Sequence, residues 1–251
     1  MGLKYLLSFF KKFIQKIISL SGYKLIKNSN FIKLYRTLDQ SLKILVKNKE
    51  PIIFDVGAHN GESIKRYTNI FNDAKFHSFE PQKKNFFKLK KYENNKIKIN
   101  NFALGAQNKI LKFNINDDDS TSSFLKASHS EKFINKKLKL NKIENIKIET
   151  LDNYVEKHKI NTIDILKIDV QGFERDVLLG AKKTLKNIVK IVELEIIFID
   201  YYQKKSSFYE LENILYPLGF ELFTVSSPVL KDKSYQLKWM DAIYISKKFF
   251  L

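Results

Sequence analysis

The chain has 251 residues, of which 44% are hydrophobic, and it carries a formal net charge of +18 with no cysteine. The length suits one domain with an appendage, the hydrophobic content excludes a wholly disordered chain, and the lack of cysteine excludes disulfides and thiolate chemistry. The charge suggests nucleic-acid binding, but all but three of the 45 basic residues are lysines spread along the chain. A phosphate-binding patch favours arginine forks, so we do not expect nucleic acid as a partner.

The first 20 residues, MGLKYLLSFFKKFIQKIISL, place apolar side chains at helical spacing and lysines on the other side. The lysines interrupt every apolar run well short of the roughly 20 residues that a membrane span needs. Such a helix lies on an anionic membrane surface, packs on the main domain, or joins a second subunit in a homodimer, and the sequence leaves these alternatives open. No signal-peptide cleavage site follows, so we expect a cytoplasmic protein, with this helix as its peripheral contact at the inner membrane surface.

From residue 51 onward, strand and helix patterns alternate along the chain. The predicted strands cover residues 51–56, 75–79, 97–103, 163–170, 189–197, 220–225 and 241–246, with an extra extended segment at 109–115. The predicted helices cover 62–71, 82–92, 151–158, 175–186 and 208–218, and residues 117–130 form a polar loop. This order predicts an α/β fold with a doubly wound, mostly parallel, seven-stranded sheet over 51–251, after a helical extension over 1–50.

The strongest local motif follows the first predicted strand and reads Asp55-Val56-Gly57-Ala58-His59-Asn60-Gly61. Its glycines permit a tight turn and a close approach of backbone to a ligand. An acid about 20 residues further on, at the end of the second strand, meets a ribose hydroxyl in nucleotide-binding folds, and Glu80 has that position. The turn lacks the middle glycine of a dinucleotide site. Adenosylmethionine has no phosphates, and an acid at Asp55 is favourable near its cationic centre.

Over residues 51–246 the chain resembles the FkbM-type methyltransferases, a branch of the class I S-adenosylmethionine-dependent enzymes. The matching stretches are FDVGAHNG at 54–61, FEP at 79–81, NFALG at 101–105, TLD at 150–152, LKIDVQGFE at 166–174, LLGA at 178–181, ELE at 193–195, LGF at 218–220 and DAIYI at 241–245. Gln171 stands where the family often has Glu, and His59-Asn60 replaces a more common pair.

The resemblance implies S-adenosyl-L-methionine as the cofactor and a Rossmann-like class I methyltransferase fold. The implied cofactor-binding residues are Asp55, Gly57, Ala58, His59, Asn60, Gly61, Glu80, Pro81, Asn101, Phe102 and Ala103. Asp55 and the two glycines would cradle the amino-acid half of the cofactor. Glu80 would hold the ribose hydroxyls, and residues 101–103 would border the adenine.

Carboxylates near the ends of the fourth and fifth predicted strands are the candidates for acceptor chemistry. Lys167 and Asp169 lie two apart and therefore share a face, and Glu193 and Glu195 repeat this spacing on the next strand. A positioned carboxylate can remove the proton of an acceptor hydroxyl, so Asp169 is our candidate base, with Lys167 keeping it ionised and Glu195 as the alternative. A structural ion pair is the competing interpretation of Lys167 and Asp169.

The four histidines are scattered and form no metal-ligand pattern, so we expect no metal. His129, in the serine-rich loop, is a further candidate for contact with the acceptor. The sequence therefore predicts an O-methyltransferase acting on a sugar hydroxyl of a surface glycan or its precursor. The alternatives are a nucleic-acid methyltransferase, which the charge favours, and a non-catalytic, membrane-docked binding protein.

Overall fold

A computed structural model describes residues 14, 16, 37–128, 138–231 and 234–250. The chain divides into two compact units, Met1–Ser41 and Leu42–Leu251, and helix α3 (Leu38–Leu45) spans the division. The predicted helix over residues 1–20 lies outside the described residues except for Ile14 and Lys16, which are helical, and His129 also lies outside them. The domain division at residue 50 stays a prediction. No helix in the described part of the chain is long and apolar enough to cross a membrane.

Within its described residues, the second unit is built on an eight-stranded sheet. Its order is β10-β11-β8-β7-β1-β2-β3, with β9 also paired to β11. The strands are β1 (Ile52–Val56), β2 (Lys75–Phe79), β3 (Ile97–Asn100), β7 (Ile163–Ile168), β8 (Val189–Ile197), β9 (Phe220–Val225), β10 (Val229–Leu230) and β11 (Leu237–Ser246). The first five run parallel and the last three are antiparallel to their partners.

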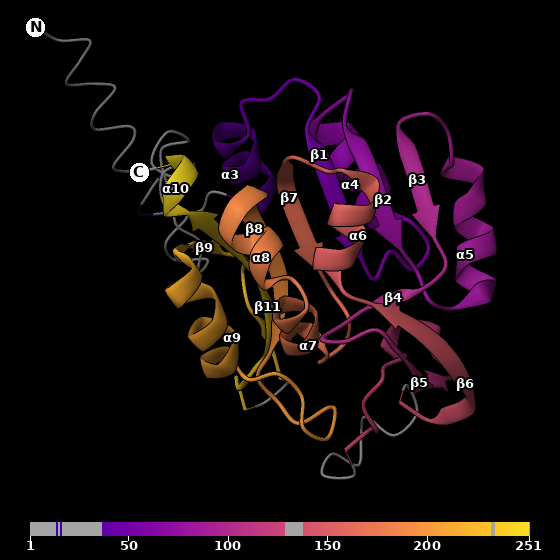
Figure 1. Cartoon of the computed structure of the whole chain (residues 1–251). Coiled ribbons are helices and arrows are strands. Elements are labelled where there is room, and N and C mark those ends of the chain that lie inside the picture. Colours follow the sequence, from indigo (N-terminus) through magenta and orange to yellow (C-terminus); the bar gives the residue numbers. More distant parts are fainter. Residues whose placement is uncertain (1–13, 15, 17–36, 129–137, 232–233, 251) are drawn as a thin grey trace, which may run out of the picture. The chain divides into compact units, whose positions relative to one another are not determined.

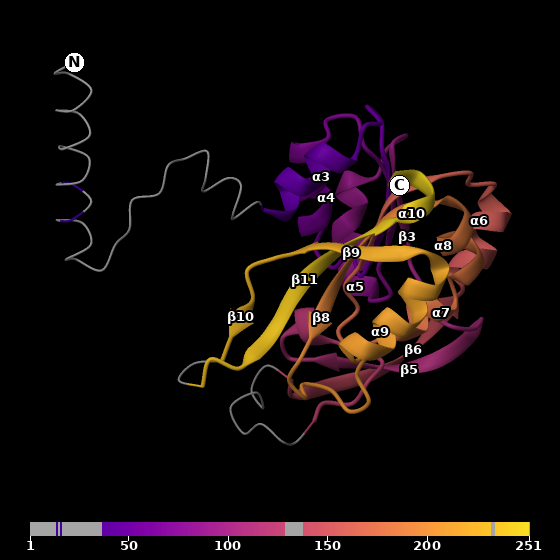
Figure 2. The ribbon, with the colours of Figure 1, turned by 90° about the vertical axis from the view of Figure 1, so that its left-hand side faces the viewer.

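The predicted α/β fold is confirmed, but the sheet is mixed and has eight strands rather than seven. The additional strand is the two-residue β10, which the sequence pattern did not reveal because it is short and exposed. β9 and β10 pair with successive lengths of the same strand, β11 (Figure 2). The antiparallel strands therefore extend the sheet beyond β8.

Helices cover both faces of this sheet. They are α4 (Glu62–Ile70), α5 (Lys83–Leu89), η1 (Lys90–Tyr92), α6 (Leu151–His158), α7 (Glu174–Leu179), α8 (Lys182–Ile188), α9 (Phe208–Leu215), η4 (Tyr216–Leu218) and α10 (Lys247–Phe250). Because side chains alternate along a strand, Phe54 and Val56 enter the main core, which α6, α7, α8 and α9 complete (Figure 1). Asp55 consequently faces the opposite side, where α4 lies.

A second sheet of three strands lies beyond the carboxyl ends of the central strands (Figure 1). It contains β4 (Ala103–Leu104), β5 (Lys109–Asn116) and β6 (Leu140–Glu149). The single strand predicted over 97–103 is therefore wrong. It breaks at Asn100 and Asn101, whose side chains donate to Ser78 O and Glu80 O and so tie this stretch to β2 and the turn after it, before the chain enters β4 of the second sheet. β6 was not predicted, because its exposed first half, LNKIE, shows little alternation of apolar and polar residues.

The single helix predicted over 175–186 is also divided, into α7 and α8, at Gly180. A Cβ atom on Gly180 would lie 2.0 Å from the carbonyl oxygen of Gly105. The chain therefore needs glycine there to let the end of α7 touch the backbone that leads into β5. This contact holds the second sheet against the helical layer.

Candidate active site

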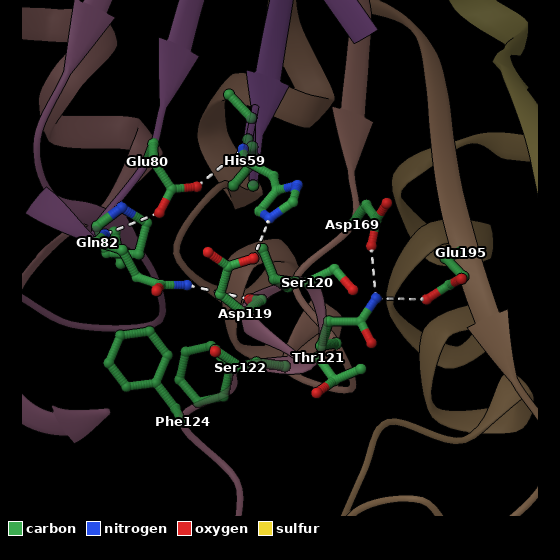
Figure 3. A pocket seen from close by; sticks show the side chains of 18 of the residues that line it. His59, Glu80, Gln82, Asp119, Ser120, Thr121, Ser122, Phe124, Asp169 and Glu195 are labelled. Carbon is green, nitrogen blue, oxygen red and sulfur yellow. Dashed lines mark hydrogen bonds and ion pairs between the residues drawn. The ribbon is translucent and has the colours of Figure 1, made fainter. Parts of the chain in front are cut away.

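A cavity of about 910 Å³ lies at the carboxyl ends of β1, β2, β7 and β8. One wall consists of the glycine turn after β1 and of Glu80 after β2. The second sheet and the loop with η2 (Asp119–Thr121) form another wall, and aromatic side chains near the end of β8 and on β11 form a third. Figure 3 shows side chains from these walls converging on one space. Ligands bind at this position in doubly wound folds.

The glycine turn forms one end of the cavity. Gly57 adopts a φ of 87°, and its added Cβ would lie 1.9 Å from the carbonyl oxygen of Asp169. Gly57 N and Ala58 N both donate to Phe79 O at 3.1 Å, which fixes the turn on β2. Gly57, Ala58 and His59 line the cavity as the sequence led us to expect. Asn60 and Gly61 do not, because Gly61 already caps α4 and Asn60 accepts from Lys88.

Glu80 is the buried acid of the cavity, with 3% of its surface exposed. One carboxyl oxygen accepts from His59 N and the other from Gln82 N, both at 2.8 Å (Figure 3). Burial raises the pKa of Glu80 to about 8, although the two backbone N–H groups act in the opposite direction. Each oxygen keeps a lone pair after these bonds, so the carboxylate can still accept from two hydroxyls. Pro81, as expected, also lines the cavity.

Asp55 lies beneath the cavity rather than in its wall. Its carboxyl is fully buried, and the ammonium of Lys167 lies 3.7 Å away. Burial raises the pKa of Asp55, and Lys167 partly compensates. Asp55 is paired in register with Lys167 across β1 and β7, which directs both side chains to the α4 face. Lys167 lines the cavity and Asp55 lies behind it, so the expected contact between Asp55 and the cofactor stays a prediction.

Lys167 stands between two carboxyls. Its ammonium lies 3.3 Å from Asp169, at the cavity surface, and 3.7 Å from the buried Asp55. Burial acts to lower the pKa of Lys167, but Asp169, Asp55 and Glu193 outweigh burial and raise it. Lys167 therefore stays protonated and holds Asp169 in place.

Asp169 and Glu195 meet at the amide of Gln171. The Gln171 amide donates to Asp169 at 3.0 Å and to Glu195 at 3.1 Å (Figure 3). Gln171 has a φ of 55° and Gly172 one of 95°, so a left-handed turn directly after β7 turns the amide back toward the strand ends. Glu174 stabilises this turn by accepting from Gly172 N at 2.9 Å and Val170 N at 3.3 Å. A residue with a side chain in this conformation is strained, which is common at functional sites.

Glu193 does not belong to the cavity. Its carboxylate accepts from Arg66 at 2.5 Å and from the hydroxyl of Tyr67 at 2.8 Å, both on α4. The spacing of two places Glu193 and Glu195 on one face, but α4 covers the first, and only the second reaches the strand ends. Glu193 therefore joins the sheet to α4.

The residues expected beside the adenine are divided between two roles. Ala103 lines the cavity. Asn101 instead donates to the backbone oxygens of Glu80 and Pro81 at 2.9 and 3.1 Å and so orients the acid-bearing turn. Phe102 packs on the ring of Phe79 at 5.5 Å between centroids. These two side chains support the wall, and their contact with the adenine stays a prediction.

Several cavity residues were missed from the sequence. Asp119 accepts from His59 Nε2 at 2.9 Å and from Lys84 at 3.1 Å, and its backbone oxygen accepts from Gln82. Burial acts to raise the pKa of Asp119, but these hydrogen bonds outweigh burial and lower it. The hydroxyl of Tyr202 contacts Thr121 O at 2.8 Å from the other side. The loop is thus held across the cavity by both walls.

Aromatic side chains complete the lining. They are Phe79, Phe113, Phe124, Phe173, Tyr201, Tyr202 and Trp239. In the sequence these aromatic residues lie near strand ends or in the polar loop, but the sequence alone does not show that they line one cavity. Within the described ranges no group of three or more His, Cys, Asp or Glu residues is placed to hold a metal ion.

Comparison with known proteins supplies the family. The sequence profile of the methyltransferase FkbM domain matches residues 55–222, which include every strand of the parallel sheet from the last residues of β1 to β8. The chain belongs to the FkbM methyltransferase family. As a member of that family it is similar to the 2-O-methyltransferase NoeI of Sinorhizobium fredii, with 24% identity over 151 residues that cover 56% of this chain and 61% of NoeI.

A solved structure supports the fold. The FkbM methyltransferase of Methylobacillus flagellatus superposes with a TM-score of 0.52 at 12% identity, over 86% of this chain and 50% of that one. The chain therefore spans between half and two thirds of the length of these two relatives. At this identity the likeness concerns the arrangement of strands and helices and not the acceptor.

Proposed function

We propose that this FkbM domain is an S-adenosyl-L-methionine-dependent O-methyltransferase that acts on a sugar hydroxyl of a surface glycan or its precursor. The observation that carries the proposal is the cavity that presents a buried acid, Glu80, and a charged strand end, Asp169, on one edge of the sheet. The family supports methyl transfer. The name of the relative NoeI, a 2-O-methyltransferase, supports oxygen as the accepting atom.

The cavity fits the cofactor in size and in the chemistry of its lining. Its volume of about 910 Å³ lies near the upper end of the range usual for small-molecule sites, roughly 300–1,000 Å³, so there is room for a cofactor and part of an acceptor. Glu80 would accept from the ribose hydroxyls, and the Gly57–His59 turn would let the backbone approach. When bound, S-adenosyl-L-methionine supplies an electrophilic methyl group on a sulfonium centre.

The residues that line the cavity would bind and orient the acceptor and remove the proton of its hydroxyl. Asp169 would accept the proton of the acceptor hydroxyl, with Lys167 holding its carboxylate at 3.3 Å. The loop held by His59 and Tyr202 would keep bulk water from the reacting atoms. Most of the rate gain in a displacement of this kind comes from holding donor and acceptor in line, which a cavity with well-anchored walls serves.

Two measurements test the proposal. Isothermal titration with S-adenosyl-L-methionine and with its demethylated product should show binding to the folded wild type, and absence of heat from both would refute the cofactor assignment. Mass spectrometry of glycans from cells with and without the protein should then show one lost methyl group. A methyl lost from RNA and not from glycans would favour the nucleic-acid alternative, and cofactor binding without any lost methyl would favour a non-catalytic binding protein.

A further inference from the structure

Two carboxyl groups from neighbouring parallel strands reach the cavity at the same level, and a single amide bridges them. Gln171 Nε2 lies 3.0 Å from Asp169 Oδ1 and 3.1 Å from Glu195 Oε2 (Figure 3). Gln171 Oε1 contacts the hydroxyl of Tyr202 at 3.0 Å. A primary amide has two N–H donors, and here each donates to one carboxyl, which orients the amide. The single proton of the Tyr202 hydroxyl is shared between Gln171 Oε1 and Thr121 O.

The surroundings of the two carboxyls differ. Asp169 has the ammonium of Lys167 at 3.3 Å. Glu195 lies directly opposite Asp241 of β11 in the strand register, and the carboxyls of Asp169, Glu174 and Asp241 act on it more strongly than the cation Lys167. Burial and these acids raise the pKa of Glu195 to about 9. Paired acids whose environments differ in this way commonly divide the roles of base and acid.

We propose that Asp169 is the base for the acceptor hydroxyl, that Glu195 donates a hydrogen bond to a second oxygen of the same acceptor, and that Gln171 positions both. This inference rests on the proposed function and deepens it. It specifies the acceptor as a hydroxyl with an oxygen on the neighbouring carbon, such as one of two vicinal hydroxyls on a sugar ring. An acceptor with one hydroxyl and no neighbouring oxygen would contact Asp169 but not Glu195.

The step balances with the groups named. The acceptor O–H bond breaks and its proton passes to the Asp169 carboxylate while the new C–O bond forms. The S–C bond of the bound donor breaks, and its electron pair stays on sulfur, which becomes a neutral thioether. Glu195 keeps its proton throughout, and its hydrogen bond to the second oxygen holds the acceptor in line.

Glutamine suits position 171 better than glutamate for this division of roles. A glutamate at position 171 would place a third carboxyl group beside Asp169 and Glu195, whereas the Gln171 amide donates to both. Like charges at this separation raise one another's pKa, so a proton would have to be shared among three acids. In Gln171→Glu the proton should therefore no longer reside on Glu195 alone. In Gln171→Ala the bridge should be lost, and both carboxyls should be held less firmly.

The first test reads protonation directly and requires no acceptor. Carbon-13 NMR of protein labelled at the Asp and Glu carboxyls, titrated from pH 5 to pH 10, should show a Glu195 resonance that changes near pH 9. Loss of that resonance in Glu195→Gln assigns it. Gln171→Glu should move its midpoint by at least about one pH unit, whereas Glu144→Gln on β6, outside the cavity, should leave it in place. A Glu195 carboxyl already ionised at pH 7 would overturn the inference, whatever the cofactor titration shows.

The second test separates the two carboxyls by turnover on the glycan acceptor found by mass spectrometry. Asp169→Asn should lower kcat by about 10² to 10⁴, the usual effect of losing a general base. Glu195→Ala should lower kcat about 100-fold, and Glu195→Gln should recover most of that loss, because an amide donates a hydrogen bond as the neutral acid does. Loss in Glu195→Gln as deep as in Asp169→Asn would place the base on β8 and refute the assignment.

Discussion

Glu80 offers a prediction whose magnitude follows from the structure. Its carboxyl is buried and its pKa is about 8, so about a tenth of the molecules carry the charged form at pH 7 and about nine tenths at pH 9. Two hydroxyls donating to the carboxylate would each contribute about 1.5–3 kcal/mol, which lowers the pKa in the complex by about two to four units. Binding therefore requires ionisation, and the dissociation constant should fall about tenfold from pH 7 to pH 9.

The assay uses methylthioadenosine, which has the ribose and adenine of the cofactor but no amino-acid group that titrates in this range. Isothermal titration at pH 7, 8 and 9 should show the tenfold gain in affinity for the wild type. Glu80→Gln keeps the shape, cannot ionise, and leaves His59 N or Gln82 N facing an N–H group, so its affinity should be lower by at least about tenfold and independent of pH. A wild-type affinity that stays constant across this range would refute the role of Glu80 at the ribose.

The same shift predicts how the stability of the free protein depends on pH. Folding raises the pKa of Glu80 above its value in the unfolded chain, so the native state binds the extra proton. Its contribution to stability is complete below about pH 4.5 and is lost as pH rises through about 8. Urea unfolding should therefore show a lower free energy of unfolding at pH 9 than at pH 6 in the wild type. A smaller difference is expected in Glu80→Gln, and an equal difference in both would refute the assignment.

Three further predictions concern the frame of the site and the N-terminal segment. Gly57→Ala should cost about 2–5 kcal/mol in the free energy of unfolding, because its Cβ would meet Asp169 O at 1.9 Å in a left-handed conformation; a loss under 1 kcal/mol would contradict the geometry. Glu193→Gln should lower the free energy of unfolding by about 1–3 kcal/mol by removing the buried carboxylate that accepts from Arg66 and Tyr67, yet leave methylthioadenosine affinity within twofold, and a larger change in affinity would place Glu193 at the site. We expect deletion of residues 1–20 to abolish sedimentation with anionic vesicles and to keep that affinity; equal sedimentation of both forms would rule out membrane binding.

The sequence predicted the parallel part of the fold well because each buried strand carries its own signal. Of these, strands 75–79 and 189–197 were placed with their observed ends, since turn residues or helix patterns bound each of them. The second sheet was not predicted as a unit. Its strands are half exposed and rich in lysine, and their pairing joins residues far apart in the chain, so no local pattern records it.

The sequence predicted those site residues that directly follow a strand. Gly57 and Glu80 each follow a strand directly, so their place at the cavity could be read from the motif and its spacing. Asp119 could not be read in this way, because it lies in a polar loop and contacts His59, 60 positions away in the chain. For Asp55 the motif predicts contact with the ligand, and the structure adds that alternation along β1 directs its carboxyl to the α4 face, beside Lys167.

The turn after β7 explains how Gln171 comes to contact both carboxyls of the site. The left-handed conformations at Gln171 and Gly172 reverse the chain within two residues, so the side chain that follows β7 points back over the ends of β7 and β8. A residue of the same kind in an extended conformation would point away from the cavity. The strain of that turn is offset by Glu174, which accepts from two of its backbone N–H groups. The amide that bridges Asp169 and Glu195 is therefore positioned by backbone geometry, and a substitution at Gly172 should disturb the carboxyl pair as surely as one at Gln171 itself.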